Sequence, residues 1–208
     1  IEFTEEENLR DKEIAIARAD TLIRELLHTT QAETYKCFVS GRHNFRYQVN
    51  PNYKANRKDR IPPTWLQSCR EFLVKEWGAI VTDGIEADDA LAIDQESSIE
   101  EVYDNMDYHD YKHAELDTLK ANSSTIIATI DKDLDQIPGW HYNWNKKKVY
   151  WIDEHQGWYN FYYQMLVGDG VDNIIGVYGC GPKTAEKLLK NCKTKEEMFE
   201  VVWKEYDR

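Results

Sequence analysis

The sequence predicts an α/β fold in which a mostly parallel central sheet is flanked by helices. Short apolar stretches alternate with amphipathic helical stretches, two of the apolar stretches end directly in acidic residues, and no internal repeat is apparent. In such a sheet, ligands bind beyond the carboxyl ends of the strands. The acidic strand ends are therefore the first place to look for a functional site.

The composition indicates a soluble protein of one domain, or of one domain with a small appendage. Of its 208 residues 41% are hydrophobic, yet no apolar run approaches the ~20 residues that would span a membrane. The four cysteines stand apart without a CxxC pair. This argues against a disulfide framework or a zinc ribbon and favours free thiols in a reducing cytoplasm. The first residues are polar and acidic, so no export signal is visible.

The first part of the chain alternates predicted helices and strands. Residues 5–30 carry apolar side chains at a spacing of about 3.6 residues, which predicts a helix, and residues 64–77 repeat the pattern. Short apolar strands ending in turns are predicted at 34–41 and 78–84. Residues 50–63 are polar and contain three prolines, which favours a surface loop or a mobile helical segment.

The second part continues this alternation. A helix is predicted from residue 85, because an acidic first turn suits the helix dipole. Residues 94–122 are polar and acidic and predict a surface insertion with helical stretches. The β-branched stretch 124–130 predicts the clearest strand, followed by an aromatic hairpin at 140–153 and an aromatic helix at 157–167.

One segment of this acidic chain is basic. The formal net charge of −12 counts against nucleic acid as a partner, because phosphate binding depends on basic side chains. Residues 42–60, however, contain six Lys and Arg residues against a single Asp. The overall charge therefore does not exclude a nucleic-acid partner.

Three groups of acids lie at the ends of predicted elements. They are Glu86, Asp88 and Asp89; Asp131, Asp133 and Asp135; and Asp169 and Asp172. Two of the groups directly follow apolar strands, and parallel strands would bring them to the same edge of the sheet. Several carboxylates at close range stay ionised only if a cation compensates their charge. All-oxygen ligands favour Mg²⁺, with Mn²⁺ as a substitute, and disfavour zinc.

Two other metal sites are weaker interpretations. Residues 131–142 match an EF-hand calcium loop at positions 1, 3 and 5, but Gln136 replaces its glycine and Tyr142 its glutamate. His109 and His113 have the spacing that can hold zinc on one helical face, but no third ligand follows. Two solvated histidines in a polar insertion are the favoured interpretation.

A glycine-spaced turn precedes a predicted lysine-bearing helix near the end of the sequence. Gly179 and Gly181 allow a tight turn with outward-facing N–H groups, and Pro182 suits the first helical position. With Lys183, these groups form an anion site suited to a DNA backbone phosphate. An ordinary glycine turn between two core helices is the alternative. The spacing excludes a dinucleotide-binding GxGxxG, and no GxxxxGK[ST] is present.

Four motifs occur in an order and spacing that resemble the 5′→3′ exonuclease and flap endonuclease family, most closely its bacteriophage members. They are NPNYKANRK (50–58), EADD (86–89), DKDLDQI (131–137) and GDGVDNIIGVYGCGPKTAEKLL (168–189). The resemblance covers roughly residues 35–192. It implies a PIN-like nuclease core over 1–165 with a basic arch segment at 42–63, and a helix-three-turn-helix DNA-binding element over 166–208.

The resemblance also implies roles for individual residues. Two divalent ions would be held by Glu86, Asp88, Asp131, Asp133 and Asp169, with Asp88 between the ions, and the site would be completed by Asp89, Asp135 and Asp172. Lys54 and Arg57 would contact the scissile phosphate, and Tyr53 would stack on a base. Further DNA contacts would come from Lys58, Gly179, Gly181, Lys183 and Thr184. In the family this turn often also holds a K⁺ ion.

Two departures from the family pattern concern the first metal ion. The family begins with a strand that ends in a metal-binding Asp, and nothing before Ile1 supplies it, which predicts a missing N-terminal stretch. A second Asp of the family follows the strand before the basic loop, where this sequence has Ser40. Both acids would serve the same metal ion.

The implied activity is Mg²⁺-dependent hydrolysis of DNA phosphodiesters by a two-metal mechanism, as a structure-specific 5′→3′ exonuclease or flap endonuclease. The expected substrate is DNA with a free 5′ end or 5′ flap, and the expected protein is a monomer in the cytoplasm, or in the host cytoplasm if phage-encoded. One alternative is a DNA-binding protein of the same fold with weak or no catalysis, which Ser40 favours. Another is a PIN-type ribonuclease, in which the duplex-binding turn would have no purpose.

Overall fold

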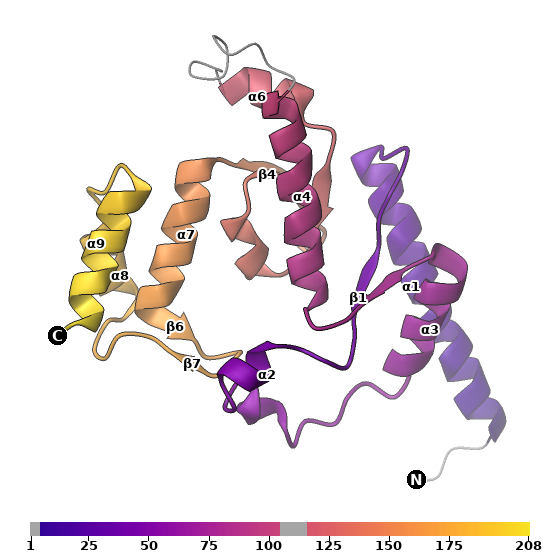
Figure 1. Ribbon diagram of the computed structural model, residues 1–208. Coiled ribbons are helices and arrows are strands. Elements are labelled where there is room, and N and C mark those ends of the chain that lie inside the picture. The colour runs from indigo at the N-terminus through magenta and orange to yellow at the C-terminus, as the bar shows by residue number, and fades with distance from the viewer. Residues whose placement is uncertain (1–4, 105–115) are drawn as a thin grey trace. The chain divides into compact units, whose positions relative to one another are not determined.

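The computed structural model of the protein describes residues 5–104 and 116–208, and its elements are labelled in Figure 1. The described residues fall into two compact units. The first unit contains those up to Phe45 and those from Asp59 to Ala90, and the second contains Arg46–Lys58 and those from Leu91 to Arg208. His109 and His113, the candidate zinc ligands, lie outside the described residues.

The first unit pairs two helices and two parallel strands. Helices α1 (Glu5–Thr30) and α3 (Leu66–Trp77) pack on each other, and β1 (Phe38–Ser40) runs parallel to β2 (Ile80–Thr82). Gly78 ends α3 in the left-handed conformation (φ 62°), which glycine adopts without steric cost. The chain then leads directly into β2, which ends shortly before the acidic residues Glu86, Asp88 and Asp89.

Helix α4 (Ala87–Asp104) follows β2, and its first residues belong to the first unit. The second unit contains a three-stranded sheet. In it β3 (Ile126–Ala128) is parallel to β4 (Gly139–Asn143), and β4 is antiparallel to β5 (Lys148–Ile152). A four-residue connection joins β4 and β5, which is why this pair forms the predicted aromatic hairpin.

Three helices enclose the core of the second unit. They are α7 (Glu154–Val167), α8 (Pro182–Leu189) and α9 (Lys195–Tyr206). The side chains of Leu166, Leu189 and Met198 are at most 1% exposed at their meeting point. Burial of each contributes about 1.5–3 kcal/mol to stability. The remaining elements are short: α2 (Arg46–Val49), η1 (Ala55–Arg57), α6 (Leu116–Asn122), η2 (Lys132–Gln136), β6 (Gly168–Asp169) and β7 (Ile174–Ile175).

The α/β character of the fold is confirmed, but the mostly parallel central sheet is not. Within the described residues the strands form three small sheets, and two of the four strand pairings, β4–β5 and β6–β7, are antiparallel. The strands are two to five residues long, and only β4 pairs with two others among the described residues. The helices expected at 5–30 and 64–77 are confirmed, and the basic stretch 50–63 forms turns and one 3₁₀ turn.

All four cysteines are unbridged. Among the described residues, no helix combines the length and the apolar character that crossing a bilayer requires.

Candidate metal and DNA-binding site

Asp131 and Asp133 lie where the chain leaves β3 and enters the 3₁₀ helix η2. The Asp131 carboxylate caps η2, because its Oδ1 accepts a hydrogen bond from the N–H of Asp133 at 3.0 Å. The N–H of Asp131 in turn donates to Thr129 Oγ1 at 3.0 Å. Two acids are therefore fixed directly beyond the carboxyl end of a strand, as the sequence predicts.

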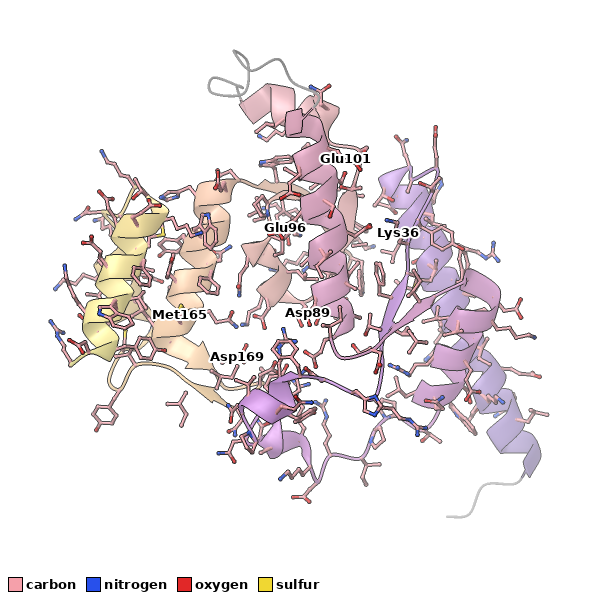
Figure 2. All side chains as sticks on the ribbon, in the orientation of Figure 1. Lys36, Asp89, Glu96, Glu101, Met165 and Asp169 are labelled. Carbon is pink, nitrogen blue, oxygen red and sulfur yellow. The ribbon has the colours of Figure 1, made fainter. Side chains whose placement is uncertain are left out.

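Asp169 is held at the end of α7 by the loop that follows it, and Figure 2 labels it where the chain passes into β6. Its side chain is only 5% exposed, and its Oδ1 accepts hydrogen bonds from the N–H groups of Val171 at 2.7 Å and Asp172 at 3.2 Å. Gly168 precedes it with φ 75°, and a Cβ there would lie 2.3 Å from the Gly176 nitrogen. Only glycine fits at this approach of β6 to β7.

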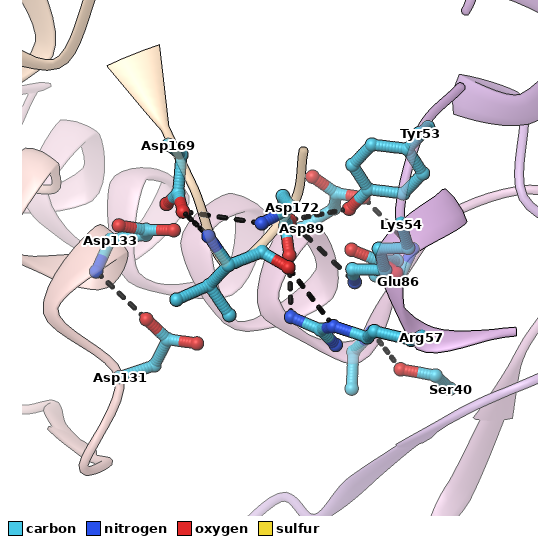
Figure 3. Close-up of polar contacts among 12 residues, drawn as sticks. Ser40, Tyr53, Lys54, Arg57, Glu86, Asp89, Asp131, Asp133, Asp169 and Asp172 are labelled. Atoms are coloured by element: carbon cyan, nitrogen blue, oxygen red, sulfur yellow. Dashed lines mark hydrogen bonds and ion pairs between the residues drawn. The ribbon is translucent and has the colours of Figure 1, made fainter. Parts of the chain in front are cut away.

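The fold brings Asp133 and Asp169 together, although they are 36 residues apart in sequence. The Gln164 side-chain amide donates to Asp133 Oδ1 and to Asp169 Oδ2, each at 2.9 Å. The Lys132 ammonium contacts the same two oxygens, at 2.9 Å and 3.4 Å. Figure 3 shows Asp131, Asp133 and Asp169 in close-up. The predicted convergence of these two acids is therefore observed within the second unit.

The two carboxyl groups of this pair have opposite pKa shifts. Burial, reinforced by the charges of Asp131 and Asp169, raises the pKa of Asp133 against the opposing effect of Lys132. Burial also acts to raise the pKa of Asp169, but the N–H groups of Val171 and Asp172, together with Lys132, hold it below its ordinary value. Ionised Asp169 thus stabilises the fold above its ordinary pKa of 3.8, and this contribution is lost as the pH falls through the lowered value.

Asp135, the third acid of its group, is engaged elsewhere in the second unit. Its Oδ1 accepts a hydrogen bond from the Tyr150 hydroxyl at 2.6 Å, and its main-chain oxygen accepts one from Asn160 at 2.6 Å. Burial and the hydrogen bond to Asp135 raise the pKa of Tyr150. These contacts indicate that Asp135 ties η2 to β5 and α7.

Asp172 anchors the basic segment of the second unit. Its carboxylate accepts hydrogen bonds from Arg57 at 2.6 Å and from the Tyr53 hydroxyl at 2.9 Å, and the Lys54 ammonium lies 3.7 Å away. Its main-chain oxygen accepts the Lys54 N–H at 2.9 Å. The contacts drawn as dashed lines in Figure 3 show this network. The segment that the sequence identified as basic is therefore joined to the loop that positions Asp169.

Tyr53 does not present its ring to solvent. The residue is 3% exposed, the Lys54 ammonium lies 4.8 Å from the ring centroid, and Tyr47 packs on it edge-on at 5.5 Å. This burial contradicts the sequence-based expectation that Tyr53 stacks on a base. The ring instead supports Lys54 and, through its hydroxyl, Asp172. Lys58 lies on the surface.

The first unit holds the other acidic group at the start of α4. Asp89 Oδ2 accepts a hydrogen bond from the N–H of Glu86 at 2.9 Å, and Ser40 Oγ accepts one from the N–H of Ala87 at 2.9 Å. The Ser40 main-chain oxygen also accepts a hydrogen bond from Arg70. Ser40, at the end of β1, thus caps α4, the helix that follows Glu86 and carries Asp88 and Asp89.

The full meeting of the three acidic groups stays a prediction, because they are divided between the two units. Within residues 5–104 and 116–208, no three His, Cys, Asp or Glu side chains form a group that could hold a metal ion. In the second unit the Lys132 ammonium lies between Asp133 and Asp169.

Sequence reasoning missed Lys132 and Gln164. The lysine lies inside the DKD motif, and no pattern pointed to the glutamine.

The glycine turn has the predicted local structure. Gly179 is in the left-handed region (φ 75°), Gly181 caps α8, and Pro182 is its first residue. A Cβ at Gly179 or Gly181 would meet no atom within 4 Å, so this backbone lies open. Lys183 and Thr184 are exposed beside it. The turn can therefore present N–H groups to an anion.

Comparison with known proteins agrees with these motifs. No protein-family model matches the sequence. A thermostable DNA polymerase I of Thermus caldophilus is 28% identical over 207 residues, which cover 87% of this chain and 21% of the polymerase. Flap endonuclease Xni of a Shewanella species is 27% identical over 167 residues, which cover 75% of this chain and 56% of that protein. The resemblance to 5′→3′ exonucleases and flap endonucleases is confirmed.

Solved structures share the fold of this chain. A bacteriophage T5 protein co-crystallised with metal ions aligns with a TM-score of 0.63 and 18% identity, over 95% of this chain and 80% of that one. A T5 flap endonuclease crystallised as a pseudo-enzyme–product complex with DNA and metal ions aligns with a TM-score of 0.55 and 17% identity, over 90% and 79% of the chains. The chain spans 21% of the polymerase and 56% of the endonuclease that it matches.

Proposed function

We propose that the protein is a divalent-metal-dependent, structure-specific 5′ nuclease that hydrolyses DNA phosphodiesters as a 5′→3′ exonuclease or flap endonuclease. The observation that carries this proposal is the Asp133–Asp169 pair, whose carboxylates face each other and share one cationic side chain. Two carboxylates this close stay ionised together only where a cation compensates their charge. T5 proteins of the same fold were crystallised with metal ions, which supports the proposal.

The donor atoms of the pair fit a hard divalent ion. Asp133 Oδ1 and Asp169 Oδ2 already share the Lys132 ammonium, so they can face a single cation, and both are the oxygen ligands that Mg²⁺ and Mn²⁺ prefer. Bound divalent ions would lower the pKa of a coordinated water and offset the charge that builds up on the phosphate. We assign Asp133 and Asp169, with Asp131 beside them, as the residues of the second unit that would hold such an ion. The further ligands Glu86, Asp88 and Asp89 stay what the family resemblance implies.

The basic side chains would act on the substrate phosphate. Lys54 and Arg57 are fixed in the second unit through Asp172, and Asp172 is joined to Asp169 through its own N–H. A cation held in place before the reaction stabilises developing charge without a cost of reorganisation. Asp172 therefore acts as the residue that positions the cationic side chains of Lys54 and Arg57.

The glycine turn would bind the DNA duplex at a point remote from the phosphodiester bond that is cleaved. Its open backbone at Gly179 and Gly181, with Lys183 and Thr184 beside it, supports a contact to backbone phosphates that does not read sequence. We assign residues 166–208 to a helix-three-turn-helix element and place a K⁺ ion at this turn. The same open turn argues against a ribonuclease that does not bind duplex DNA. Ser40, at the end of β1 where the family pattern has a carboxylate, favours a non-catalytic DNA-binding protein as the second candidate.

Cleavage of a 5′-flap DNA by the full chain tests the proposal. We expect Mg²⁺ or Mn²⁺ to support release of a product with a 5′ phosphate, and EDTA to stop it. An RNA strand of the same geometry should be cut more slowly. Stable duplex binding without cleavage in either metal would favour the binding protein, and preferential cleavage of the RNA would favour the ribonuclease.

Lys183→Ala should weaken duplex binding more than it slows cleavage. Loss of one phosphate contact lowers the slope of log K against log salt by about 0.9, whatever the DNA sequence. Fluorescence anisotropy at several salt concentrations measures that slope, and single-turnover cleavage at saturating DNA measures the rate. Lys75→Ala is the matched control, because Lys75 lies outside residues 166–208, is 83% exposed on α3 and pairs with Glu76. An unchanged slope for Lys183→Ala would remove the turn from the DNA interface.

A further inference from the structure

The Asp133–Asp169 pair has a cation of its own. The Lys132 ammonium lies 2.9 Å from Asp133 Oδ1 and 3.4 Å from Asp169 Oδ2. The Gln164 amide donates to the same two oxygens at 2.9 Å each. One charged and one neutral donor thus hold the two carboxylate oxygens that would face a metal ion.

The partners of this cluster differ in how firmly they are held. The Asp169 side chain is 5% exposed and receives two main-chain N–H groups on its other oxygen. The Lys132 side chain is 69% exposed and rests on a flexible four-carbon stem. The carboxylate that accepts the cation is therefore fixed, whereas the ammonium can rotate into solvent without disturbing the core.

One ammonium balances only half the charge of two carboxylates. A divalent ion balances both and coordinates oxygens at about 2.0–2.1 Å, closer than an ammonium hydrogen bond allows. Both cations need the same oxygens, Asp133 Oδ1 and Asp169 Oδ2, so they cannot be bound there together.

We propose that the Lys132 ammonium is an internal counter-cation that holds the Asp133–Asp169 pair together in the metal-free protein and is displaced when a divalent ion binds. This inference rests on the metal site of the proposed function. Lys132 is then a positioning residue. It prevents the two acids from repelling each other, and it lowers the affinity of the site because the ion must displace it.

Lys132→Met tests the displacement directly, because methionine has nearly the same length but no charge. We expect Mn²⁺ to bind this variant about fivefold more tightly than the wild type, the equivalent of ~1 kcal/mol for an ion pair that is exposed on one side. Titration of Mn²⁺ followed by electron paramagnetic resonance, without DNA, measures this affinity. Lys132→Arg keeps the charge and should retain the wild-type affinity.

Thermal unfolding supplies a second readout. In EDTA, Lys132→Met should melt about 2–4 °C below the wild type, since the two acids lose their counter-cation. In saturating Mn²⁺ this gap should close, because the ammonium is then absent from the site in both proteins. Lys204→Met, which removes the ammonium of another surface ion pair, should leave the Mn²⁺ affinity unchanged.

The outcomes separate this inference from the proposed function. Unchanged or weaker Mn²⁺ binding by Lys132→Met would overturn the displacement. Absence of Mn²⁺ binding in every protein would overturn both the displacement and the metal site. Tighter binding by Lys132→Met, together with no cleavage of flap DNA by the wild type, would support the displacement and reject the nuclease.

Discussion

Replacing Asp169 by asparagine is expected to slow metal-dependent cleavage of a 5′-flap DNA by at least about 10³-fold, or ~4 kcal/mol of barrier. We expect this loss because the Asp169 carboxylate lies where a metal ion would be coordinated. Its Oδ2 faces Asp133 across the Lys132 ammonium, and its side chain is only 5% exposed. An asparagine amide turned toward that position would present hydrogens to the metal ion, to Lys132 and to Gln164. Single-turnover cleavage at saturating Mg²⁺ gives the rate.

Asp135→Asn is the matched control for this variant. Asp135 belongs to the same acidic stretch, but its Oδ1 is bound by the Tyr150 hydroxyl at 2.6 Å. We expect its cleavage rate to stay within about tenfold of the wild type, less than ~1.4 kcal/mol of barrier. Circular dichroism confirms that both variants are folded at the assay temperature. Equal losses in the two variants would show that general damage to the fold, and not a lost metal ligand, slows the reaction.

Asp172→Ala is expected to lower the free energy of unfolding by about 3 kcal/mol. The substitution leaves Arg57 and Lys54 side by side without their shared carboxylate and removes the acceptor of the Tyr53 hydroxyl. The side chains of Lys54 and Asp172 are only 17% and 18% exposed, whereas that of Arg57 is 36% exposed. Urea unfolding followed by circular dichroism measures the change.

Asp59→Ala provides the comparison, because Asp59 is an exposed acid next to the same basic segment. A surface substitution of this kind changes stability by less than about 0.5 kcal/mol. A double-mutant cycle of Asp172→Ala with Arg57→Ala isolates their coupling, which we expect at about 1–3 kcal/mol. A coupling near zero would mean that Asp172 is not what holds Arg57 in place.

Local patterns predicted the elements well. The helix at 5–30, the aromatic hairpin and the start of α8 at Pro182 all depend on neighbours within a few residues, such as apolar spacing or a glycine before a proline. The prediction of a mostly parallel sheet is not confirmed, because strand pairing depends on contacts between segments that are distant in sequence. Strands of two to five residues leave little pattern from which to infer them.

The sequence by itself determined which residue types lie at the ends of β2, β3 and α7, and that one basic segment and one glycine turn accompany them. Only the tertiary structure decided how these side chains are used. Asp133 shares its cation with Asp169, whereas Asp135 is bound by Tyr150, although all three looked alike in sequence. Tyr53 became a buried support of Asp172. The physical reason is that a carboxylate's charge and hydrogen bonds depend on which groups the fold places within about 3 Å of it.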